Sequence, residues 1–180
     1  MEFSSIGWPV SFNVRCPSCG GRATFDEPFA FLSGSKKDVA SEGLQAHRWG
    51  GWLVVEKYPS LLPWKAPHGS HQIIVFSEPN PPNGEYVYHQ TGVIRCEECF
   101  RLGVHKLNWP DDAYYRWDIR GHVLWAWSAE HAHALLSYID SRNREVGGGP
   151  YARNLLRLPK EFLDAKVRER IVKLIRGTLS

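Results

Sequence analysis

Short apolar runs, separated by polar, glycine and proline positions, fill the first two thirds of the chain. Runs of this length predict β-strands. Residues 12–26 indicate a strand, a turn and a return strand, whereas 33–51 is polar and predicts an exposed connection. Segment 111–117 has no clear pattern. Further strands are expected at 52–57, 71–76, 86–88, 92–95, 103–107 and 122–127, of which 71–76 has the clearest buried pattern.

The apolar period changes to that of a helix after residue 127. Ser128 is a residue type favoured at helix N-caps. The helix after it is expected to end at about Asn143, before the glycine run at 147–149. A short helix is expected at 154–158, and a last one should end near Gly177. The apolar positions at helical spacing are Ala132, Leu135, Leu136 and Ile139 in the first helix and Leu163, Val167, Ile171 and Leu174 in the last.

These elements predict an α+β protein in which the strands come first and the helices follow. We expect a β-rich metal-binding domain over residues 1–127 and a helical, basic extension over 128–180 that packs on it. The composition agrees with a folded chain, because 43% of the 180 residues are apolar and 13% are aromatic. These fractions exclude an intrinsically disordered protein.

Targeting signals and nucleotide-binding motifs are not found in the sequence. No stretch approaches the ~18 consecutive apolar residues of a transmembrane helix. Residues 1–5 lack the basic start and apolar run of a secretory signal. No phosphate-binding glycine loop or serine-hydrolase elbow occurs, so no nucleotide cofactor is expected. We therefore expect a cytoplasmic protein with no membrane partner.

All four cysteines occur in two C-x-x-C pairs, Cys16 with Cys19 and Cys96 with Cys99. Two residues between cysteines allow both thiolates to face one cation from a tight turn, and zinc takes four such ligands in a tetrahedron. The spacing therefore predicts one structural Zn²⁺ per chain. An iron–sulfur cluster would use the same ligands and stays open. Disulfides fit poorly without a secretory signal, and no βαβ pattern supports a thioredoxin-like redox pair.

The two cysteine pairs and the residues beside them resemble zinc-ribbon and treble-clef zinc-binding proteins. The resemblance rests on residues 15–21 (RCPSCGG) and 93–99 (VIRCEEC), and it covers two short hairpins, roughly a sixth of the chain. Two features depart from the pattern: 76 residues separate the pairs, and Phe100 rather than glycine follows the second pair. The resemblance implies that all four thiolates bind the metal, which leaves no open position for metal catalysis.

Basic residues are concentrated near the C-terminus. Residues 91–180 hold 15 Lys and Arg against 11 Asp and Glu, whereas residues 1–90 hold 7 against 8. Lys166, Arg170 and Lys173 share one face of the last predicted helix, and Arg153 and Arg157 follow the glycine run. A basic face of this kind is typical of phosphate contacts. A solvated face with local ion pairs, such as one between Asp164 and Arg168, is the alternative.

The eight tryptophans and eight histidines suggest further functions. Trp125 and Trp127 share a strand face and would stack on unpaired bases if exposed. They would fill the core or anchor a protein partner otherwise. The histidines and asparagines between the cysteine pairs permit a comparison with HNH nucleases, which matches poorly because no helix is expected after the asparagines. The residues concerned are His68, His71, His89, Asn80 and Asn83.

We therefore expect a non-catalytic, zinc-stabilised protein that binds nucleic acid through its basic helical region and nearby aromatics. The expected contacts are Lys166, Arg170, Lys173, Arg153, Arg157, Trp125 and Trp127. A protein-interaction subunit of a larger complex is the first alternative, with the same aromatics at the interface. A divergent HNH-like nuclease is the second. No catalytic residue is assigned.

Overall fold

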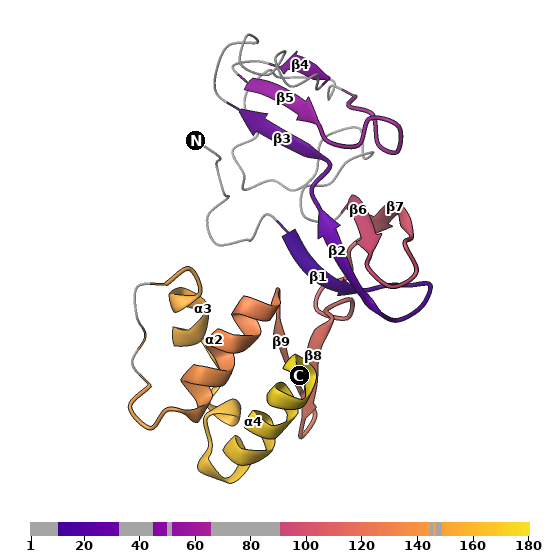
Figure 1. Ribbon diagram of the computed structural model, residues 1–180. Helices are drawn as coiled ribbons and strands as arrows, with labels where there is room; N and C mark the ends of the chain where they lie inside the picture. The colour runs from indigo at the N-terminus through magenta and orange to yellow at the C-terminus, as the bar shows by residue number, and fades with distance from the viewer. Residues whose placement is uncertain (1–10, 33–44, 50–51, 66–90, 145, 147–148) are drawn as a thin grey trace. The chain divides into compact units, whose positions relative to one another are not determined.

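The protein is an α+β protein, as the sequence predicts (Figure 1). The computed structural model describes residues 11–32, 45–49, 52–65, 91–144, 146 and 149–180. The chain forms two compact units. Unit 1 comprises Met1–Ser11 and Cys16–Asn108, and unit 2 comprises Phe12–Arg15 and Trp109–Ser180.

An antiparallel sheet in unit 1 carries the segments on either side of the cysteines. It contains β2 (Arg22–Asp26), β6 (Thr91–Cys96) and β7 (Leu102–Lys106), in that order across the sheet. Phe25 pairs with Ile94, and Ile94 pairs with Gly103. The strands expected at these places from the sequence are confirmed.

A second antiparallel sheet in unit 1 has the order β3 (Phe29–Leu32), β5 (Trp52–Glu56), β4 (Ala46–Trp49). All five residues of β5 are buried, which agrees with a central strand. The sequence predicts β5, but it predicts neither β3 nor β4, because a four-residue strand is stabilised mainly by pairing with a remote partner. The strands expected at 71–76 and 86–88 lie outside the described residues.

The strand β1 spans Ser11–Arg15, and its residues Phe12–Arg15 belong to unit 2, which continues from Trp109. The Asn13 N–H donates to the carbonyl of Trp127 (2.6 Å), and the Arg15 N–H donates to the carbonyl of Asp112 (2.8 Å). The hairpin β8 (Tyr115–Ile119) and β9 (His122–Ala126) follows. Both turn residues, Arg120 and Gly121, have positive φ, the geometry of the tight turns that suit twisted hairpins.

Three α-helices follow the hairpin: α2 (Ala129–Asp140), α3 (Ala152–Leu156) and α4 (Ala165–Leu179), with a 3₁₀ turn η1 (Lys160–Phe162) before α4. The predicted N-cap is confirmed, because the Ser128 hydroxyl accepts from the His131 N–H. Asp164 caps α4 by accepting from the Lys166 N–H instead of pairing with Arg168. The last helix continues past Gly177.

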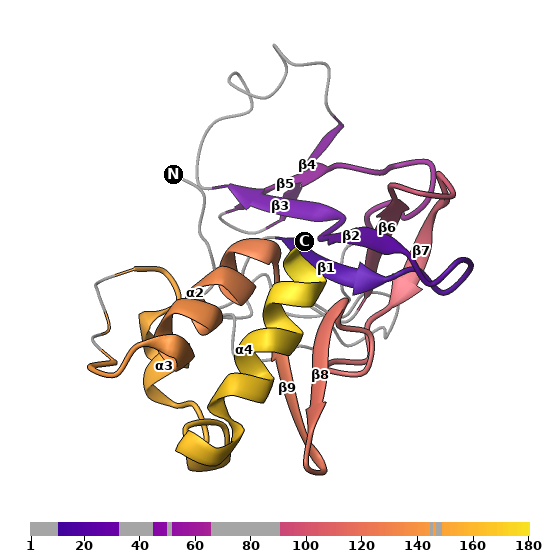
Figure 2. The ribbon, with the colours of Figure 1, turned by 60° about the horizontal axis from the view of Figure 1, so that its bottom comes forward.

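One apolar core joins the hairpin to the helices of unit 2. Figure 2 shows α4 beside α2 and the hairpin, and the Trp117 indole donates to the Thr178 hydroxyl (3.0 Å). Leu174, expected on the buried face of the last helix, is 37% exposed. The core face of α4 instead follows a four-residue spacing and comprises Val167, Ile171, Val172 and Ile175. The rest of the core comprises Tyr115, Trp117, Ile119, Leu124, Ala126, Ala132, Leu135, Ile139, Leu155 and Phe162.

The division between the two compact units falls at Asn108–Trp109, whereas the expected β-rich domain over 1–127 and helical extension over 128–180 stay a prediction. The hairpin shares its core with the helices, since alternate residues of β8 and β9 face them. The independent folding of a β-rich domain and a helical domain stays a prediction.

Candidate functional site

The cysteine pairs lie in two turns of unit 1 with the same backbone conformation. The Cys16 N–H donates to the carbonyl of Gly21 (2.8 Å), and the Cys96 N–H donates to the carbonyl of Arg101 (2.9 Å). The residue after each pair has positive φ: 77° at Gly20 and 57° at Phe100. Glycine adopts this conformation freely, but a side chain with a Cβ does not. Phe100 therefore occupies the place of a turn glycine.

The four sulfur atoms form one cluster, as the sequence predicts. All four Sγ atoms lie within 4.8 Å of one another. Cys16 Sγ is 3.7 Å from Cys99 Sγ, and Cys19 Sγ is 3.5 Å from Cys96 Sγ. Four sulfurs at ~2.3 Å from a central zinc ion would be about 3.8 Å apart at the corners of a tetrahedron. The cluster therefore has a geometry that fits one metal ion.

Backbone N–H groups point at the sulfurs and favour their charged form. The N–H groups of Ser18, Gly21 and Cys99 each donate to a cysteine Sγ, all at 3.4 Å. Hydrogen bonds to a thiolate stabilise negative charge on the ligand. The turns thus supply the polar groups that metal-bound sulfur requires.

The pKa values indicate that the thiols titrate as a group. Burial alone would raise the pKa of Cys16, but hydrogen bonds from the Cys19 and Ser18 N–H groups and from neighbouring thiols lower it to about 6. At Cys19 the Gly21 N–H lowers the pKa, yet the interaction with Cys96 and burial raise it to about 12. One thiolate thus opposes ionisation of the next. A divalent cation removes this opposition and would hold all four as thiolates.

Polar contacts also join the two turns directly. Arg22 forms an ion pair with Glu97 (2.5 Å), and its N–H donates to Glu98 Oε1 (3.2 Å). Arg101 Nη1 donates to Ser18 Oγ (2.5 Å). A Cβ on Gly21 would lie 2.2 Å from the Glu98 carboxyl group, so the exposed Glu98 side chain would have to shift to accommodate it. These contacts fix the orientation of the cysteines around the cluster.

The basic face predicted for the last helix is present on α4. Lys166, Arg170 and Lys173 are all exposed. Their positions lie within about 60° of one another around the helix axis. None of the three forms an ion pair or a side-chain hydrogen bond within the part of the chain that the structure describes. We call these three residues the α4 basic face.

The structure does not bring the other predicted contacts into this face. Arg153 lies on α3 and Arg157 follows it, both exposed and both outside α4. Trp127 is buried, and Trp125 is half-buried with its ring 5.2 Å from that of Trp109 and 5.3 Å from that of Trp127. Trp127 therefore has no ring face free for a base in this structure.

His131 is a buried residue that sequence reasoning does not single out. Its ring stacks on Tyr151 (centroids 4.6 Å apart), and its Nδ1 accepts from the Trp127 N–H (3.2 Å). Burial lowers the pKa of His131 to about 4. The ring is therefore neutral near pH 7 and belongs to the packing of unit 2. No local signal predicts this, because Tyr151 lies on a different element.

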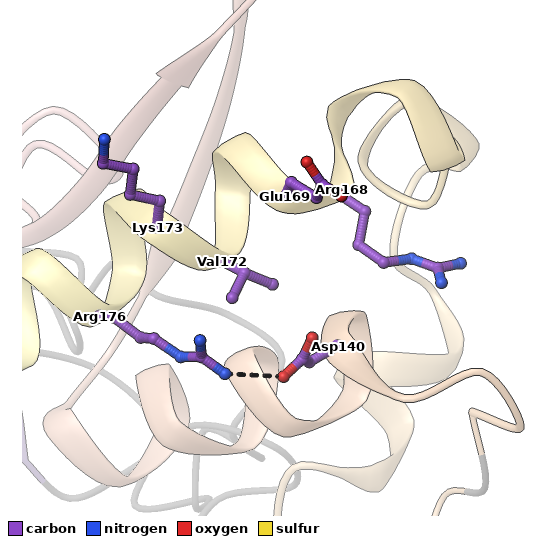
Figure 3. A pocket seen from close by; sticks show the side chains of 6 residues that line it. All are labelled: Asp140, Arg168, Glu169, Val172, Lys173 and Arg176. Carbon is purple, nitrogen blue, oxygen red and sulfur yellow. Dashed lines mark hydrogen bonds and ion pairs between the residues drawn. The ribbon is translucent and has the colours of Figure 1, made fainter.

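A groove of about 330 Å³ between α2 and α4 is lined by both charges (Figure 3). Arg176 reaches Asp140 across it in an ion pair of 2.8 Å. Figure 3 shows Arg168 and Lys173 extending away from this pair and from each other. The cations do not converge, so the groove lacks the geometry of an anion pocket.

The residues compared with HNH nucleases, at positions 68 to 89, lie outside the described residues. Among the helices that the structure describes, none is long and apolar enough to cross a membrane. Comparison of the chain with protein-family models, with curated proteins and with solved structures gave no match. The resemblance to zinc-ribbon proteins therefore rests on the four cysteines and their geometry.

Proposed function

We propose that the protein is a non-catalytic, zinc-stabilised nucleic-acid-binding protein. The four-cysteine cluster would hold one Zn²⁺ in unit 1, and the α4 basic face would contact phosphates from unit 2. The observation that carries the nucleic-acid part is the exposure of Lys166, Arg170 and Lys173 without ion pairs among the described residues.

Zinc is the metal that the donor set supports best. Four thiolates in a tetrahedron suit Zn²⁺, which needs no further ligand in a structural site. With every position filled by sulfur, the ion would stabilise the fold and bind no substrate. Free thiols of this kind persist in a reducing compartment, so we propose a cytoplasmic location. Metal analysis of the purified protein should give about one zinc and no iron per chain.

The α4 basic face supports phosphate binding because its charges are not neutralised locally. Only Glu169 adds an acidic side chain to α4 itself, whereas Lys166, Arg168, Arg170, Lys173 and Arg176 are basic. Unit 2 as a whole holds 13 Lys and Arg against 9 Asp and Glu. Such contacts recognise the backbone of a nucleic acid and not its sequence.

The test is a titration of the zinc-loaded full chain with labelled 20-nucleotide single-stranded RNA and DNA of mixed sequence at two salt concentrations. Wild-type binding should weaken strongly as salt rises. The triple change Lys166→Gln, Arg170→Gln and Lys173→Gln should weaken binding to both the RNA and the DNA. It should also reduce the salt slope by about 2, since each single-strand phosphate contact contributes ~0.7.

The matched control removes three exposed charges elsewhere in unit 2: Arg153→Gln, Arg157→Gln and Lys160→Gln. Because these three residues lie outside α4, this control should change the salt slope less than the α4 variant does. Equal affinity and slope in wild type and the α4 variant would refute the proposal, provided that circular dichroism shows both helical.

A further inference from the structure

Three large apolar side chains are exposed within five residues beside the cysteine cluster. Phe100 is 84% exposed, Leu102 51% and Val104 44%. Exposed apolar residues are common singly, but a group of them on one strand and the turn before it indicates an interaction site. We call these three residues the β7 apolar edge.

The backbone at Phe100 is held in a conformation that its side chain disfavours. Its φ is 57°, in the left-handed region where bulky residues are rare and strained. Gly20 occupies the equivalent place in the first turn and has no such strain. Folding alone would be served better by glycine at both places. The aromatic ring is thus exposed at a position where it costs stability.

Among the residues that the structure describes, no strand pairs with the outer side of β7. It is the last strand of its sheet among the described residues. The hydrogen bond from the Cys96 N–H to the Arg101 carbonyl sets the alternation of the antiparallel ladder. Residues 101, 103 and 105 therefore turn their N–H and C=O groups toward β6, and residues 102, 104 and 106 turn theirs outward.

Two exposed cations lie beside the β7 apolar edge. Arg95 is the Cα partner of Leu102 on the neighbouring strand, and its side chain is exposed despite a long contact with Asp26 (3.8 Å). Lys106 is exposed two residues beyond Val104, on the same face of the strand. The acidic residues nearby are engaged: Glu97 pairs with Arg22, and Asp26 accepts from Tyr58 (2.8 Å). The apolar pair thus lies between two cations.

We propose that β7 is a docking edge for an extended peptide segment of a partner protein. The segment would add a strand beside β7 by pairing with the outward backbone groups of Leu102, Val104 and Lys106. Side chains at every second position of the peptide would face the edge, two apolar ones on Leu102 and Val104 and acidic ones near Arg95 and Lys106. This surface belongs to unit 1 and is separate from the α4 basic face.

The experiment selects 12-residue peptides from a random display library on the zinc-loaded full chain. The enriched peptides should carry apolar residues at alternate positions with acidic residues beside them. A synthetic peptide of the enriched sequence should bind at least about tenfold more weakly to the double variant Leu102→Ser, Val104→Ser, a change of ~1.4 kcal/mol. Leu156→Ser is the matched control, because Leu156 is exposed in unit 2 and should leave affinity unchanged.

Other outcomes would overturn the proposal. They are an absence of enriched peptides, a basic consensus, or equal binding to the double variant with zinc content preserved. Displacement of the peptide by single-stranded RNA would assign the edge to nucleic acid. Concentration-dependent self-association that the double variant abolishes would assign it to a second copy of the chain.

Phe100→Gly separates docking from folding. Because glycine relieves the positive φ, this variant should raise the melting temperature of the zinc-loaded protein. It should also weaken peptide binding at least about threefold, because the exposed ring is lost. Unchanged affinity would show that Phe100 is not part of the docking edge. A lower melting temperature would contradict the backbone strain assigned to Phe100.

Discussion

Unit 2 and unit 1 are stabilised in different ways. In unit 2, one core of fourteen buried residues joins a hairpin to three α-helices. In the described part of unit 1, apolar clusters form on the faces of β5, one around Phe29, Trp49 and Val54 and one around Leu53 and Val55. The two turns of unit 1 that lie 76 residues apart instead meet at four sulfur atoms. Apolar packing thus joins the elements of unit 2, whereas the turns of unit 1 meet at a cluster whose geometry fits a metal ion.

This difference follows from what each kind of contact needs. Apolar packing in unit 2 joins residues that are mostly close in sequence, so little chain entropy opposes it. The cysteine turns enclose a long segment, and bringing them together is favourable only if the contact is strong. A structural zinc ion supplies an apparent free energy on the order of 10 kcal/mol, but only once its ligands are assembled.

The largest expected effect is that of metal removal, which should disrupt unit 1 and spare unit 2. Chelation, or Cys96→Ser, should increase amide hydrogen exchange in peptides from residues 16–32 and 91–106. Without the cation, the metal–sulfur bonds are lost and the two turns are no longer held in order. Peptides from α2 and α4 should keep their protection. The measurement is hydrogen exchange followed by mass spectrometry. Pro17→Ala is the control, since it alters an exposed position of the same turn without removing a cysteine or the contact of Ser18 with Arg101. Simultaneous loss of protection in both units would contradict the comparison.

A cavity in the helical core should destabilise unit 2 and spare unit 1. Ile171 is fully buried in α4, and Ile171→Ala should cost about 2–5 kcal/mol of the unfolding free energy of unit 2. Leu174→Ala, three residues away on the exposed side, should cost less than about 1 kcal/mol. Denaturant titration followed by circular dichroism at the helix band measures both, and the zinc content should be that of wild type. Equal costs at the two positions would show that the assigned core face of α4 is wrong.

A smaller effect should come from acid, through His131. Its pKa in the folded protein is about 4, below the ordinary value of 6.5, so the unfolded chain binds a proton first as the pH falls. The stability of unit 2 should therefore be complete above pH 6.5 and decline toward pH 4, by up to about 3 kcal/mol.

His131→Asn should flatten this decline, because asparagine offers an acceptor to the Trp127 N–H but does not titrate. His133→Asn, at an exposed position, should keep the wild-type pH dependence. Both variants retain all four cysteines, so the difference between their pH profiles isolates unit 2 from acid effects on the metal centre. Parallel profiles for the two variants would exclude His131 as the source.

The sequence predicts best what depends on spacing along the chain. The cysteine cluster follows from two short motifs, and α2 with its Ser128 cap follows from one apolar period. The basic face of α4 follows from the same helical periodicity, because the residues opposite a buried apolar stripe face solvent.

Contacts between remote segments are the part that the sequence does not predict. Strands β3, β4 and β8 are short, and each becomes recognisable only beside its partner. The burial of Trp127 and the stack of His131 on Tyr151 depend on where α3 packs. The sequence shows that Phe100 stands where a glycine is expected after the second cysteine pair. Its exposure and the direction of the β7 hydrogen bonds appear only in the structure.

The order of segments along the chain has a consequence for synthesis on the ribosome. Unit 1 is inserted into unit 2, because residues 12–15 belong to unit 2 and the remainder of that unit starts at residue 109. The acceptor of the Asn13 N–H, the Trp127 carbonyl, is translated 114 residues later, which at ~5–20 residues per second takes about 6–23 s. The last cysteine, Cys99, is translated before Trp127. All four cysteines are therefore available to a metal ion while the Asn13 N–H still lacks its acceptor at Trp127.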